Sequence, residues 1–141
     1  RDHDVLSGAY KVAAALATLG RPLPDPVRLQ ATALAVLAGP APGGATQLRN
    51  AYEVLMLCGS AGAPPLSERD LLGLIDAARR GLAVLRRDDG GWAMYAHERR
   101  GTALSSPRKI RLACWRLAGV ADDAIPLLPG AAAFRARLAA R

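Results

Sequence analysis

The sequence predicts an all-α fold, a compact bundle of about five to six helices joined by Gly/Pro-rich loops, and three observations support this class. Apolar residues recur at helical spacing along most of the 141-residue chain, and no segment shows the sustained alternation of a half-buried strand. Only six residues are aromatic, so Leu, Val and Ala must supply most of the core. Such a core favours close helix packing over a sheet, and we expect a single all-helical domain covering residues 1–141.

The first two helices are each marked by capping or breaking residues. The first is expected to begin after an N-cap at Asp4 and to end at Gly20, before a proline-rich connection. The second is expected to begin at Asp25 and Pro26, an N-cap followed by a proline in the first turn. Within it, residues 31–38 include one polar side chain only, so we expect this helix to be central and enclosed on most sides.

The next two helices follow glycine- and proline-rich turns. Thr46 is expected to cap the third helix, in which residues 54–58 are entirely apolar. Ser67 and Asp70 have the spacing of a capping box at the start of the fourth, which is the clearest amphipathic helix in the chain. Its predicted buried stripe consists of Leu71, Leu74, Ile75, Ala78, Leu82 and Leu85.

Two further helices are predicted in the C-terminal third. Ser106 is expected to be the N-cap of the fifth, with Pro107 at the first helical position and Gly119 as its end. Residues 131–141 are expected to form a short sixth helix. The predicted buried stripe of the fifth helix consists of Ile110, Ala113 or Cys114, and Leu117.

Cysteine usage and hydropathy point to a cytoplasmic protein. Cys58 and Cys114 form neither a metal-ligand spacing nor a disulfide framework, so we expect two buried, reduced thiols. The sequence has no run of eighteen apolar residues and no charged-then-apolar leader, so no membrane partner is expected. Because the chain starts at Arg1 rather than Met, an earlier segment is compatible with the sequence.

The stretch RRDDGGWAMYAHERRG, residues 86–101, contains most of the groups that could perform catalysis. His97 has no partner at a recognisable catalytic spacing, and no further carboxylate follows Asp88 and Asp89 at the spacing of a metal-binding loop. We interpret residues 88–91 as a helix stop, and Trp92 and Tyr95 as residues that fold the connection back on the core. The sequence therefore predicts neither an enzyme nor a cofactor or metal site.

The charge distribution points instead to binding of an anion. The net charge is +7, of which +6 lies in residues 67–141, and no acidic residue occurs from position 99 to position 121. Arginine binds phosphate bidentately and tryptophan offers a face for stacking, so we expect a nucleic-acid-associated regulator that uses the Arg-rich segment 99–116. The residues predicted to bind nucleic acid or another polyanion are Arg99, Arg100, Arg108, Lys109, Arg111, Trp115 and Arg116.

An alternative from a different class is a homo-oligomeric or adaptor protein. The helical segments 31–38 and 54–58 are apolar nearly all round, and a chain of this size has limited surface with which to cover both. A spare apolar face would then seal a homodimer or receive a helix of a protein partner. The two hypotheses are compatible, because a dimer doubles the basic surface.

Overall fold

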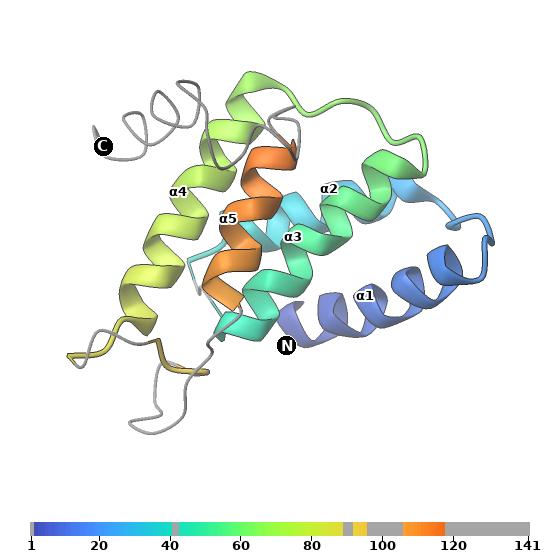
Figure 1. Ribbon diagram of the computed structural model, residues 1–141. Coiled ribbons are helices and arrows are strands. Elements are labelled where there is room, and N and C mark those ends of the chain that lie inside the picture. Colours follow the sequence, from blue (N-terminus) through green and yellow to red (C-terminus); the bar gives the residue numbers. More distant parts are fainter. Residues whose placement is uncertain (1, 41–42, 89–91, 96–105, 118–141) are drawn as a thin grey trace.

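The computed structural model describes residues 2–40, 43–88, 92–95 and 106–117, with the backbone alone at positions 106–108 and 115. These residues form five helices and no strand: α1 (Asp2–Thr18), α2 (Pro26–Ala38), α3 (Ala45–Ser60), α4 (Glu68–Leu85) and α5 (Ser106–Leu117) (Figure 1). The predicted all-α bundle is therefore confirmed. The predicted helix at residues 131–141 and the predicted stop at Gly119 lie outside the described residues.

Helix α3 is the centre of the bundle, and each of the other four helices packs against it (Figure 1). Half of its residues are buried, with Leu48, Val54 and Leu55 no more than 1% exposed, and one partly exposed to exposed line runs through positions 46, 49, 53, 56 and 60. Small residues such as Ala45 and Ala51 are also fully buried, which lets neighbouring backbones approach closely. Within the apolar run 54–58, Val54, Leu55 and Cys58 thus belong to the core, while Met56 and Leu57 are partly exposed.

The expectation that residues 31–38 are central and enclosed is wrong. On α2 only Gln30, Ala33 and Leu37 are buried, while Thr32 and three of the alanines are exposed. Helix α2 is therefore a peripheral helix with one inward face. An alanine methyl group adds little apolar surface, so exposing it costs little, and a run of alanines does not require burial on all sides.

Two of the predicted helix starts are confirmed by their side-chain hydrogen bonds. Asp25, in the left-handed region at φ 45°, accepts a hydrogen bond from the backbone N–H of Arg28 at 3.0 Å. Ser67 and Asp70 form the predicted capping box, in which each side chain accepts from the other residue's backbone N–H at 3.1 Å. In both cases the cap satisfies an N–H that the first helical turn leaves unpaired.

Three other predicted caps are wrong, because α1 begins at Asp2, α3 begins at Ala45 and Ser106 is already the first residue of α5. Asp4 lies inside α1, where its carboxylate accepts a hydrogen bond from the Gln47 side chain on α3 at 2.5 Å. Gly44 occupies the N-cap position of α3 in place of Thr46, and its N–H donates to the Gln47 side chain at 2.7 Å. The contact between Asp4 and Gln47 joins residues 43 positions apart, so local spacing does not reveal it.

Glycines in the left-handed conformation end α1 and α3. Gly20 (φ 62°) follows α1 as predicted, and the N–H of Arg21 donates to the Leu16 carbonyl at 2.8 Å. Gly62 (φ 88°) follows α3, where the N–H of Ala63 donates to the Cys58 carbonyl at 2.9 Å. Both patterns are Schellman motifs, which require a positive φ at the residue after the helix.

The buried hydroxyl of Tyr52 connects α3 to α4. Tyr52 is fully buried, and its hydroxyl donates a hydrogen bond to the backbone carbonyl of Leu74. Leu74 lies on the inward face of α4 with Ile75, Ala78 and Leu85, which confirms four members of the predicted stripe as buried. A fully buried phenol requires such a partner, because an unpaired polar group in the core is costly.

Substitution of Gly62 by alanine is expected to lower the free energy of unfolding by about 1–2 kcal/mol, because a β-carbon disfavours the left-handed conformation. Gly73 provides the matched control: it lies inside α4, and a β-carbon there meets no atom within 4 Å. Gly73→Ala is expected to stabilise by about 0.5–1 kcal/mol through higher helix propensity. Urea denaturation measures both, and equal signs for the two variants would contradict this assignment.

Removing the Tyr52 hydroxyl tests the link between α3 and α4. Tyr52→Phe is expected to lower the free energy of unfolding by about 1–3 kcal/mol, because the Leu74 carbonyl loses its donor inside the core. Tyr10→Phe is the control, since the Tyr10 ring is only partly buried and keeps its contact with the Arg49 guanidinium, 5.5 Å from the ring centre. Chemical unfolding of both variants checks the prediction, which fails if the two changes have equal effects.

Candidate polyanion-binding surface on helix α5

Helix α5 is anchored through one face against α3 and α4 (Figure 1). Ile110, Ala113 and Cys114 are buried on this face, with exposed fractions of 0 to 7%, and Leu117 packs against the core from its edge. The predicted buried stripe of this helix is confirmed. This anchoring fixes which side chains of α5 point outward.

The outward surface of α5 carries basic side chains. Lys109, Arg111 and Arg116 are all exposed. At about 100° per residue, positions 109 and 116 share one edge of the outward face and position 111 lies at the other edge. Backbone positions 108 and 115 fall between these edges, so the helical register places all five positions on the side opposite Ile110.

The structure brings together only part of the predicted binding set. Lys109, Arg111 and Arg116 lie on the outward surface of α5, which is defined hereafter as the α5 surface. Arg108 and Trp115 are placed by the backbone of α5 alone. Arg99 and Arg100 lie outside the described residues, as does His97.

The described residues after α4, 86–88 and 92–95, pack against the end of the bundle where α3 begins. Helix α4 ends at Leu85, three residues before Asp88, and the Arg86 guanidinium lies over the Trp92 ring at 4.4 Å from its centre. The N–H of Ala93 then donates to the Leu85 carbonyl at 2.8 Å, and the Met94 carbonyl accepts from the N–H of Ala45 at 2.9 Å. The connection therefore folds back on the first turn of α3.

Trp92 packs against the core from a partly buried position, as predicted, whereas Tyr95 is 37% exposed and contacts Gly44. Asp88 is an exposed turn residue, and residues 89–91 of the predicted helix stop lie outside the described residues. Residues 92–95 thus have a clear structural role as a cover for the N-terminus of α3.

Both cysteines are free and buried, as predicted. Burial raises the pKa of the Cys58 thiol to about 11, and burial raises the pKa of the Cys114 thiol to about 12. The reactive species of cysteine is the thiolate, which is scarce at neutral pH for such groups. These two thiols therefore suit packing better than nucleophilic catalysis.

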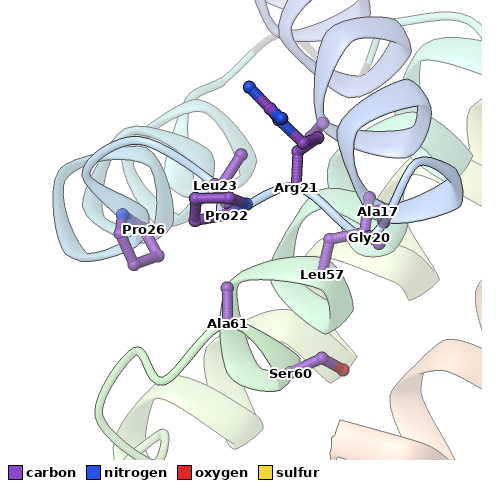
Figure 2. Close-up of a pocket in the computed structure, with 10 residues that line it drawn as sticks. Ala17, Gly20, Arg21, Pro22, Leu23, Pro26, Leu57, Ser60 and Ala61 are labelled. Carbon is purple, nitrogen blue, oxygen red and sulfur yellow. The ribbon is translucent and has the colours of Figure 1, made fainter.

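A groove of about 540 Å³ lies where the end of α1, the following loop and the end of α3 meet (Figure 2). Its lining is mostly apolar or small, with Ser60 as a hydroxyl donor, and the Arg21 guanidinium points away from Leu57 and Ser60 (Figure 2). A catalytic site needs several convergent polar groups. The groove does not supply such a set from the side chains that line it.

The described residues contain neither a metal-binding cluster nor a membrane-spanning helix. No group of three or more His, Cys, Asp or Glu side chains in this part of the chain is arranged to hold a metal ion. None of the described helices is both long and apolar enough to cross a membrane. Comparison with protein-family models, curated proteins and solved structures found no match to this chain.

Sequence reasoning missed an exposed apolar surface on α1. Val5, Val12 and Leu19 are 65%, 61% and 72% exposed. Of the segments expected to offer a spare face, 54–58 is mostly in the core and 31–38 exposes mainly alanines. The seven-residue spacing of these three large side chains in the sequence could have indicated this surface. They lie to one side of the buried residues Leu6 and Ala13, roughly 90–130° around the helix axis from the line that joins those two.

The raised thiol pKa values predict slow cysteine labelling in the folded protein. At pH 8 the native chain is expected to react with Ellman's reagent at least about tenfold more slowly than the chain in urea, because burial limits both access and thiolate formation. A full burst of two thiols from the native protein would contradict the assigned burial.

The raised thiol pKa values also make stability depend on pH. Because the folded-state pKa values exceed the ordinary value of 9.0, the contribution of the protonated thiols to the free energy of unfolding is complete below pH 9. It decreases as the pH rises toward 11 and 12.

Proposed function

We propose that this is a non-enzymatic, basic helical binding protein that associates with nucleic acid through the α5 surface. The observation that carries the proposal is the exposure of Lys109, Arg111 and Arg116 on a helix whose opposite face is buried. These residues belong to a span, from 99 to 121, without any acidic residue. An approaching phosphate backbone therefore meets positive charge without a competing carboxylate from the same segment.

The chemistry of the segment fits a phosphate backbone in particular. Arginine presents a planar fork of donors that matches phosphate oxygens, and the lysine adds a point charge. We include Arg99, Arg100, Arg108 and Trp115 in the proposed contact set, with Trp115 giving stacking or apolar contact to a base. A helix held by Ile110 and Cys114 would present these groups with little loss of backbone freedom on binding.

Two further observations support binding in the cytoplasm rather than catalysis or secretion. Both cysteines are free and buried, which suits a reducing compartment. Cys114, the one cysteine of the basic segment 99–116, has its pKa raised to about 12 by burial. We therefore propose a cytoplasmic binding protein without a cofactor.

Fluorescence anisotropy with labelled duplex and single-stranded DNA across a salt series tests the proposal. If four phosphates are engaged, log K against log salt is expected to have a slope of about −3 to −4. In the double variant Lys109→Gln with Arg111→Gln, the slope is expected to become about 1.8 less negative, because about 0.9 is lost for each duplex phosphate contact removed.

The matched control removes two positive charges elsewhere. Arg28 and Arg69 are exposed in the first turns of α2 and α4, and Arg28→Gln with Arg69→Gln lowers the net charge by the same amount. This control is expected to retain the wild-type slope. An equal loss in the two double variants would show attraction to net charge alone, and no salt-dependent binding at low ionic strength would overturn the proposal.

A further inference from the structure

The outward face of α1 carries an apolar stripe that the described part of the chain leaves open. Val5, Val12 and Leu19 are three of the seven large apolar side chains found exposed among the described residues, and Leu19 is the most exposed of these at 72%. Leu19 continues the helical register, because its N–H donates to the Ala15 carbonyl at 3.0 Å. The three residues recur every seven positions, which places them on one line along the helix.

Small residues lie between these large ones. Gly8 and Ala15 are exposed on the same face, and a β-carbon at Gly8 meets no atom within 4 Å. We define Val5, Gly8, Val12, Ala15 and Leu19 as the α1 stripe. It alternates large and small residues, so it has projections and recesses at regular intervals.

We propose that the α1 stripe pairs with the α1 stripe of a second copy of this chain, antiparallel and about a two-fold axis midway between Val12 and Ala15. In this orientation the large residues of one helix face the small residues of the other, for example Val12 over Ala15 of the second copy. A parallel pair would instead place Gly8 against Gly8 and leave a gap. The shape of the stripe is therefore complementary to itself in one orientation.

The charges at the two ends of α1 favour the same orientation. Asp2 and Asp4 lie in the first turn, no basic residue lies in the last turn, and exposed Arg21 follows three residues after the helix. Antiparallel pairing brings the acidic end of each helix toward Arg21 of the second copy, and it also aligns the helix dipoles favourably. Figure 2 shows the Arg21 side chain directed away from Leu57 and Ser60 on α3.

A second copy explains these features better than an unrelated helix. The large residues and the recesses that receive them both lie on α1. The acidic residues and Arg21 lie at the two ends of the same helix. One surface therefore supplies both sides of the contact, as an isologous two-fold interface requires. The proposal does not rest on nucleic-acid binding, because it uses no residue of the α5 surface. Its test can therefore fail or succeed independently of the anisotropy experiment.

Sedimentation equilibrium of the 141-residue chain over a wide concentration range tests the dimer. The expected result is a mass of twice 14.7 kDa that dissociates on dilution. Val12→Glu is expected to raise the dimer dissociation constant roughly tenfold or more, because it places two carboxylates near the axis. Val84→Glu on α4, where the valine is 54% exposed, is the control and is expected to leave the mass unchanged.

A larger side chain at Gly8 separates pairing from folding. Gly8→Leu is expected to retain the circular dichroism spectrum and thermal midpoint of the isolated chain, because the space around Gly8 is open and leucine favours helix. The same change is expected to raise the dimer dissociation constant about tenfold, since it fills the recess that receives a large residue. A monomeric wild-type chain at every concentration, or equal dissociation in Val84→Glu, would overturn the proposal.

Cross-linking tests the orientation of the helices. With a short bismaleimide, Val12→Cys is expected to form a covalent dimer and Val5→Cys is not, because antiparallel pairing separates the two position-5 residues by roughly 25 Å along the axis. The buried native thiols Cys58 and Cys114 give a low background, which the wild-type chain measures. Efficient cross-linking through Val5→Cys would show parallel pairing and overturn the proposed arrangement.

Discussion

The enclosure of α3 is the constraint on which the rest of the structure depends. Four helices pack against this one helix, so the α3 residues that face them have to be apolar, small or internally hydrogen-bonded. Leu48, Val54 and Leu55 are large and apolar, and Ala45 and Ala51 are small. The buried polar residues are hydrogen-bonded: Tyr52 donates to the Leu74 carbonyl, and the side-chain oxygen of Asn50 accepts from the Arg49 guanidinium. Because α3 fills the centre, the other helices need only one buried face each.

The high alanine content explains why the positions of the helices could be predicted from the sequence more accurately than how deeply each helix is buried. The stripes of α4 and α5 contain leucine and isoleucine against charged neighbours, so their buried faces could be predicted from periodicity alone. Helix α2 is different, because its run of alanines looks apolar on all sides while most of those methyl groups face solvent. The same composition hid the α1 stripe: small residues separate Val5, Val12 and Leu19, so the buried line through Leu6 and Ala13 was the more visible pattern.

The starts of α2 and α4 could be predicted, because in each the N-cap side chain accepts a hydrogen bond from an N–H three residues on. Asp25 with the Arg28 N–H, and Ser67 with Asp70, are of this kind. At α3 the prediction failed, because the N-cap is Gly44, which has no capping side chain, and the N–H of Ala45 is bound by the carbonyl of Met94 from a distant segment. For the candidate site the same limit applies: periodicity predicted that Ile110 and Cys114 would be buried and hence which side of α5 faces outward. It did not show how far Arg99 and Arg100 lie from that side, because this depends on the connection before the helix.

The two proposed surfaces are physically compatible, and together they would have a consequence that neither has alone. The α1 stripe and the α5 surface share no residue, so pairing through α1 does not use the basic side chains of α5. A two-fold dimer would present two α5 surfaces to one polyanion, and binding of the first would raise the effective concentration of the second. Each α5 surface has only a few charged contacts, which in a monomer gives weak and salt-sensitive binding. Association of two copies would therefore be the simplest physical route from a modest basic surface to stable binding, provided that both surfaces reach the same polymer.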